Sequence, residues 1–124
     1  MKKVICSAKA PKAIGPYSQA IEANGTLYVS GQLPVNPSDG TIPQTIEEQT
    51  HQCFANIKAI LDEAGYGFEN VVKSVVLLSD IKDFAAINKV YADYYTEKMP
   101  ARLCYQVAAL PMGAKIEVET TAVK

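Results

Sequence analysis

The sequence has one histidine, no excess of charge of either sign, and no apolar run long enough to span a bilayer. The single histidine, His51, lies among polar residues of a predicted helix and is most simply an exposed residue, so a Cys–His pair, a Ser–His–Asp triad and a metal site are all weakly supported. Twelve basic and thirteen acidic residues give a net charge of −1 without any basic stripe. These absences argue against a metal site, phosphate-driven binding of nucleic acid and insertion into a membrane.

Cysteines and targeting signals are also sparse. Cys6, Cys53 and Cys104 are an odd number without metal-type spacing, which fits a reducing cytoplasm. The first residues start basic but turn polar at once, unlike a secretory signal. With 124 residues, 48% of them hydrophobic, we expect one domain over residues 1–124.

Hydrophobic periodicity predicts six strands and two helices. The Asn24–Gly25 pair predicts a tight hairpin, and Thr45 with Glu48 has the form of a capping box at a helix start. Asp80 is the predicted cap of the second helix, which Pro100 cannot continue. The expected strands cover residues 2–6, 17–23, 26–31, 70–79, 102–108 and 114–123, and the first helix covers residues 45–64.

The element order β-β-β-α-β-α-β-β predicts an α+β fold with both helices on one face of a mixed sheet. The β-branched run at 70–79 is typical of a strand buried on both faces. Because the helices cover only one face, we expect several copies to pack their sheets around an axis.

The strongest functional clue lies near the C-terminus. Arg102 and Cys104, two residues apart on a strand, point to the same face. The short connection at residues 110–113 predicts that the last strand folds back beside this one and brings Glu117 near that face. A guanidinium, a thiol and a carboxylate would then suit a small carboxylate substrate and a reaction that uses water.

Each of these residues also has a structural explanation. Arg102 could form an ion pair, and Glu117 could be a solvated side chain on an exposed sheet face. Cys104 has no neighbouring base, so it is better read as a pocket wall whose backbone N–H matters as much as its sulfur.

Four further residues give weaker signals. Tyr17 follows a rigid Gly–Pro turn, and Ser30 with Gly31 ends a strand where backbone could approach a ligand. Asn88 could turn its amide toward an apolar wall or lie at a helix edge. The alternatives are a half-buried aromatic for Tyr17 and a bulge for Gly31.

Taken together, these segments resemble the RidA/YjgF family of reactive-intermediate deaminases. The resemblance covers essentially the whole chain, including both helices. The matching motifs are AIGPYSQA at residues 13–20, VSGQLP at 29–34, PARLC at 100–104 and KIEVE at 115–119.

The resemblance implies a chorismate-mutase-like fold, a homotrimer with sites between subunits, and no cofactor. It also implies hydrolysis of 2-iminobutanoate and 2-iminopropanoate to 2-oxo acids and ammonia. By the resemblance, Arg102 binds the substrate carboxylate, the Cys104 segment lines the pocket, and Glu117 orients water and moves a proton. Tyr17, Ser30, Gly31 and Asn88 would complete the binding wall.

Two residues depart from the family pattern: Leu103 replaces a small serine, and Met99 stands where an aromatic is common. We expect these two residues to affect the substrate preference and the shape of the pocket rim. Two other functions stay open at this point. One is a trimer that binds 2-oxo acids without turnover; the other is an RNA-directed protein, which the near-neutral charge disfavours.

Overall fold

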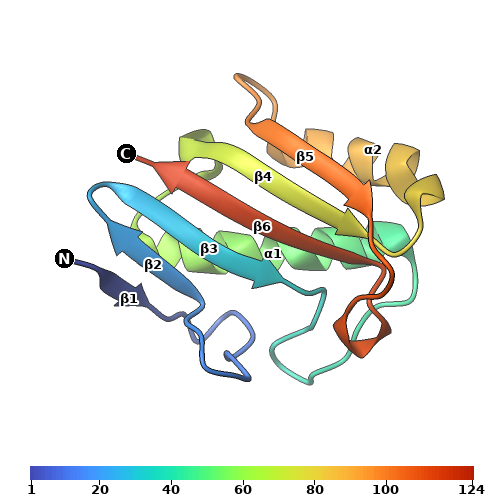
Figure 1. Cartoon of the computed structure of the whole chain (residues 1–124), viewed down its shortest axis with the longest axis horizontal. Helices are drawn as coiled ribbons and strands as arrows, with labels where there is room; N and C mark the ends of the chain where they lie inside the picture. Colours follow the sequence, from blue (N-terminus) through green and yellow to red (C-terminus); the bar gives the residue numbers. More distant parts are fainter.

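Two layers make up the fold in this computed structural model, which describes residues 1–124 (Figure 1). One layer is a six-stranded mixed sheet, and the other holds both helices on a single face of it. This arrangement confirms the predicted fold class. The strands are β1 (Lys3–Ile5), β2 (Ala20–Ala23), β3 (Thr26–Gln32), β4 (Val71–Leu78), β5 (Ala101–Gln106) and β6 (Ile116–Val123). The helices are α1 (Ile46–Ala64) and α2 (Phe84–Tyr94), with short 3₁₀ turns at Phe68–Asn70, Ile81–Asp83 and Pro111–Gly113.

Helix α1 begins and ends where predicted, but only one half of the predicted capping box forms, because the Glu48 side chain makes no hydrogen bond to the Thr45 N–H. The Thr45 hydroxyl accepts a hydrogen bond from the Glu48 N–H at 3.1 Å, which satisfies one of the free donors of the first turn. Gly65 ends the helix in the left-handed conformation, with φ of 78°. Between these caps, Phe54 and Ile57 are fully buried against the sheet.

Helix α2 begins later than predicted. Asp80 caps the 3₁₀ turn Ile81–Asp83, where it accepts from the Lys82 N–H at 2.9 Å, and the α-helix begins only at Phe84. The helix ends at Tyr94, well before Pro100, because Tyr95 turns to extended backbone. That turn lets the Tyr95 ring pack in the core, where it is only 4% exposed.

The strand order is β1-β2-β3-β6-β4-β5, and only β4 and β5 pair in parallel. The prediction that the last strand folds back beside β5 is therefore wrong, because β4 lies between them (Figure 1). The crossover through α2 places β5 parallel to β4 at the sheet edge, and β6 inserts between β3 and β4. Strand β2 starts at Ala20 rather than 17, so Tyr17 lies in a loop.

The two faces of the sheet have different surroundings. Alternate residues of β4 and β6, such as Val76 and Val118, are buried under the helices. The opposite face has no cover within the chain, and Tyr28, Leu103 and Tyr105 are 54%, 50% and 46% exposed there. The expected burial of β4 on both faces is thus not met within a single chain.

Candidate active site

Arg102 lies on the helix-covered side of the sheet edge. In β5 it pairs with Ser74 of β4, whose side chain is fully buried beneath the helices. Cys104 pairs with buried Val76 and points the same way. The prediction that Arg102 and Cys104 share a face is confirmed.

Helix α2 holds the Arg102 guanidinium from one side. The guanidinium carbon lies 5.3 Å from the centre of the Phe84 ring and 4.8 Å from that of Tyr91. One terminal N–H donates to the Asn88 Oδ1 at 2.8 Å. The three α2 residues are spaced by four and three positions, so they occupy one helical face.

Arg102 has no acidic partner. The single salt bridge in the chain joins Lys58 to Asp62, both on α1. The interpretation of Arg102 as half of a structural ion pair is therefore wrong. Its guanidinium is held in place by uncharged groups, and most of its donors stay free for an anion.

Cys104 is half-buried behind this arginine. Burial raises the pKa of the Cys104 thiol, and the nearby Arg102 charge offsets only part of that effect. The thiol is therefore mostly protonated at neutral pH, which does not suit a nucleophile. We call Asn88, Arg102 and Cys104 the edge half of the site.

Glu117 lies on the opposite face of the same sheet. It pairs with Leu77, one position out of phase with the buried residues Val76 and Leu78. From a strand spacing of about 4.8 Å and a rise of about 3.3 Å per residue, the Cα atoms of Arg102 and Glu117 are roughly 14 Å apart. The prediction that Glu117 joins Arg102 on one face of one chain is wrong, because the two side chains lie on opposite faces of the sheet and β4 also separates their strands.

Glu117 instead contacts a bulge in β3. The register shift between Val29 and Gln32 places Ser30 and Gly31 opposite a single residue of β6. A Cβ at Gly31 would lie 2.8 Å from the Glu117 Oε2, so only glycine leaves room for this carboxylate.

Ser30 and Tyr17 lie on the same side of the bulge. The Ser30 hydroxyl donates to the Ser18 carbonyl at 2.6 Å and thereby ties β3 to the loop that carries Tyr17. Tyr17 is 51% exposed and borders a shallow hollow on the open face together with Ser30. We call Tyr17, Ser30, Gly31 and Glu117 the bulge half of the site.

The surroundings of Glu117 raise the pKa of its carboxyl group. Burial raises the pKa of Glu117, and the neighbouring Glu119 charge raises it further. A carboxyl with a raised pKa can both accept and return a proton closer to neutral pH, as general acid–base catalysis requires.

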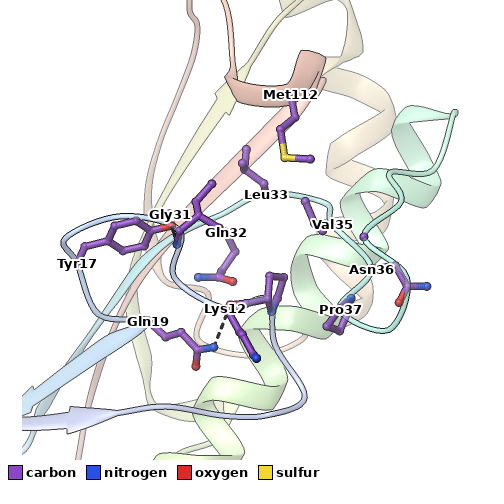
Figure 2. A pocket seen from close by; sticks show the side chains of 13 residues that line it. Lys12, Tyr17, Gln19, Gly31, Gln32, Leu33, Val35, Asn36, Pro37 and Met112 are labelled. Atoms are coloured by element: carbon purple, nitrogen blue, oxygen red, sulfur yellow. Dashed lines mark hydrogen bonds between the residues drawn. The ribbon is translucent and has the colours of Figure 1, made fainter.

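A second hollow, more enclosed than the first, adjoins the bulge half and has a volume of about 280 Å³ (Figure 2). The N-terminal loop, the loop after β3 and the turn before β6 surround it. Sequence reasoning missed this hollow because irregular loops carry no periodic signal. It also missed Phe84 and Tyr91 as supports of Arg102, although their spacing around Asn88 was visible.

Two structural absences complete the description. No three His, Cys, Asp or Glu side chains converge as a metal-ligand cluster. Neither helix combines the length and hydropathy of a bilayer-crossing segment. Leu103, the departure beside Arg102, faces the open side of the sheet and lies away from the guanidinium.

Residues 7–124 match the model of a protein family described as Endoribonuclease L-PSP. The chain belongs to this family. The chain is 50% identical to a goat (Capra hircus) protein named 2-iminobutanoate/2-iminopropanoate deaminase, over all of this chain and 91% of that protein. The structure of RidA from an Antarctic Psychrobacter matches with a TM-score of 0.96 at 42% identity, over 98% of this chain and 99% of that one. E. coli TdcF with bound serine matches with a TM-score of 0.95 at 40% identity, over 98% of each chain. These relatives confirm the resemblance to Rid proteins.

Proposed function

We propose that this protein hydrolyses 2-iminobutanoate and 2-iminopropanoate to the corresponding 2-oxo acids and ammonia. The observation that carries the proposal is the Arg102 guanidinium, which is fixed by aromatic rings and Asn88 but has no acidic partner. A site of this kind suits the planar carboxylate that both imines carry. The name and high identity of the goat relative support the same activity.

The complete site would form between neighbouring copies. The edge half and the bulge half lie on opposite faces of one sheet, so a single chain cannot bring Arg102 and Glu117 to one substrate. The open sheet face exposes Tyr28, Leu103 and Tyr105, which another copy would cover. A homotrimer with a cyclic axis would satisfy both requirements and provide a site at each interface.

In the proposed mechanism, two parallel N–H groups of Arg102 bind the substrate carboxylate. The Asn88 Oδ1 holds the guanidinium plane, and the Cys104 backbone N–H contributes a further donor from the edge strand. Tyr17 and Ser30 would line the opposite wall. These residues position the imine carbon against the bulge half of the neighbouring copy.

Glu117 would orient the attacking water and transfer protons as general base and general acid. Its carboxylate takes a proton from water as the water oxygen forms a bond with the imine carbon. Glu117 returns that proton to the nitrogen of the tetrahedral intermediate and then transfers the hydroxyl proton to the same nitrogen. The C–N bond breaks, ammonia leaves with the bonding electron pair, and the C=O bond of the 2-oxo acid forms. The imine carbon is already electrophilic, so positioning and proton transfer suffice without a covalent intermediate.

The test uses an imine made in situ by an amino-acid oxidase and trapped by semicarbazide. The protein should consume the imine faster than water does and thereby lower the semicarbazone yield. Binding of a 2-oxo acid in calorimetry without any change in imine consumption would instead identify a non-catalytic binding protein. Cleavage of RNA by the protein would instead support an RNA-directed function, which the net charge of −1 disfavours.

A further inference from the structure

The enclosed hollow beside the bulge half has no part in the mechanism above. Its volume of about 280 Å³ would hold roughly nine waters, at about 30 Å³ for each water in the liquid. Five of its thirteen lining residues are hydrophobic, and its single charged side chain is Lys12. A hollow of this size and composition can enclose an apolar group of several carbons.

Buried amides hold the walls of the hollow in place. Asn56 of α1, only 1% exposed, donates to the carbonyls of Leu33 and Val35 at 3.1 and 2.9 Å. Gln19, 3% exposed, donates to the Pro11 carbonyl at 2.9 Å, the bond drawn in Figure 2. Both surrounding loops are therefore fixed from beneath, and the hollow exists before any ligand enters it.

Met112 contributes the remaining wall from an unusual backbone position. Its φ of 61° lies in the left-handed region that methionine rarely adopts, and Gly113 follows with φ of 67°. Figure 2 shows the Met112 side chain turned toward Leu33. A strained conformation that aims an apolar side chain over a hollow is typical of functional sites.

The hollow shares Tyr17 and Gly31 with the bulge half of the site. Gly31 lies beside the Glu117 carboxylate, because a Cβ added to Gly31 would come within 2.8 Å of the Glu117 Oε2. A substrate whose imine carbon lies near Glu117 would therefore direct its side chain along Gly31 into the hollow.

We propose that this hollow is the side-chain pocket of the imine substrate and that Leu33 and Met112 make it prefer apolar side chains of four or more carbons. The inference rests on the proposed deaminase function. A methyl group, about the size of one water, would leave most of the volume to water, whereas a branched four-carbon chain would contact both walls. Each added methylene in such a pocket is worth roughly tenfold or more in kcat/KM.

The experiment compares imines made in situ from alanine, 2-aminobutanoate and leucine with the unmodified chain. We expect kcat/KM for the leucine-derived imine to exceed that for the alanine-derived imine at least about tenfold. Leu33→Phe fills the hollow and should reduce or abolish that ratio. Met112→Gly removes a wall and relieves the left-handed strain, and it should also lower the ratio. Asn24→Gly, at φ of 52° in the distant β2–β3 turn, is the matched control and should leave the ratio unchanged.

The outcomes separate this inference from the proposed function. Equal kcat/KM values for alanine- and leucine-derived imines, or a ratio unaffected by Leu33→Phe, would overturn the pocket assignment and leave the deaminase proposal standing. Hydrolysis of none of the imines would overturn the deaminase proposal itself. Calorimetry with the unmodified chain then still tests the pocket, because 4-methyl-2-oxopentanoate should bind at least tenfold more tightly than pyruvate. Equal affinities would refute it.

Discussion

A chain without Arg102 and a chain without Glu117 should restore activity to each other when they assemble together. Arg102→Ala disables the edge half, and Glu117→Gln disables the bulge half. Since the two side chains lie on opposite faces of one sheet, each complete site would take one half from each of two neighbouring copies. A mixed assembly then contains interfaces where an intact Arg102 meets an intact Glu117.

The size of the recovery follows from this geometry. In a closed ring with random 1:1 assembly, half of the sites have an intact Arg102 and half of those have an intact Glu117, so about one quarter of the wild-type activity should return. This fraction holds for any ring size. Among assemblies that contain both chains, a trimer would have one active site in three and a dimer one in two, so about one third would identify a trimer.

The assay gives the two variants different affinity tags, co-expresses them and purifies assemblies through both tags in turn. Imine consumption is then measured by semicarbazide competition for the mixture and for each variant alone. Arg102→Ala combined with Asn88→Leu is the control, because both changes disable the edge half and no interface is complete. If doubly tagged assemblies of Arg102→Ala and Glu117→Gln show no more activity than their parents, the shared site is refuted.

Four single substitutions test the remaining roles. Arg102→Lys keeps the positive charge but loses the two parallel donors. Steady-state kinetics should show kcat/KM lowered about 10- to 100-fold, chiefly through a higher KM, as expected for the loss of about 1.5–3 kcal/mol of binding free energy. An unchanged KM would contradict bidentate binding. Cys104→Ala should keep kcat within about threefold, because burial raises the thiol pKa and leaves no nucleophile; complete inactivity would contradict this. Glu117→Gln should abolish turnover but retain calorimetric binding of 2-oxo acids. Burial and the Glu119 charge raise the pKa of Glu117 in the folded chain above its ordinary value of 4.5. The free energy of unfolding, measured in urea, should therefore fall as the pH rises from 4.5 through the pKa of the folded chain. Glu117→Gln should remove this part of the pH dependence. Gly31→Ala would place a methyl 2.8 Å from the Glu117 Oε2 and should lower kcat at least about tenfold while the circular dichroism spectrum stays unchanged; full activity would show that this contact is unimportant.

Local signals predicted much of the fold. The Thr45 cap and the end of α1 at residue 64 both depend on residues close in sequence, and the structure confirms both of them. The start of α2 was predicted less well, because Asp80 caps a 3₁₀ turn that precedes the α-helix.

The choice of strand partners was not readable from local patterns. Arg102 and Cys104 were placed correctly because their relation is set by alternation within one strand. Glu117 was placed wrongly because its position depends on β6 inserting between β3 and β4. Likewise, the loops around the enclosed hollow depend on hydrogen bonds from Asn56, more than twenty residues away, and sequence spacing does not reveal such contacts.

Because one face of the sheet is uncovered in a single chain, the stability of the fold should depend on protein concentration. A monomer exposes Tyr28, Leu103 and Tyr105 to water, and the edge of β5 is unpaired. An exposed apolar face beside an unpaired strand edge favours aggregation with other unassembled chains. Partner copies that cover this face would add to stability in proportion to the logarithm of their concentration. Dilution should therefore lower the melting temperature, and overproduction should protect the fold only while association outpaces misassembly.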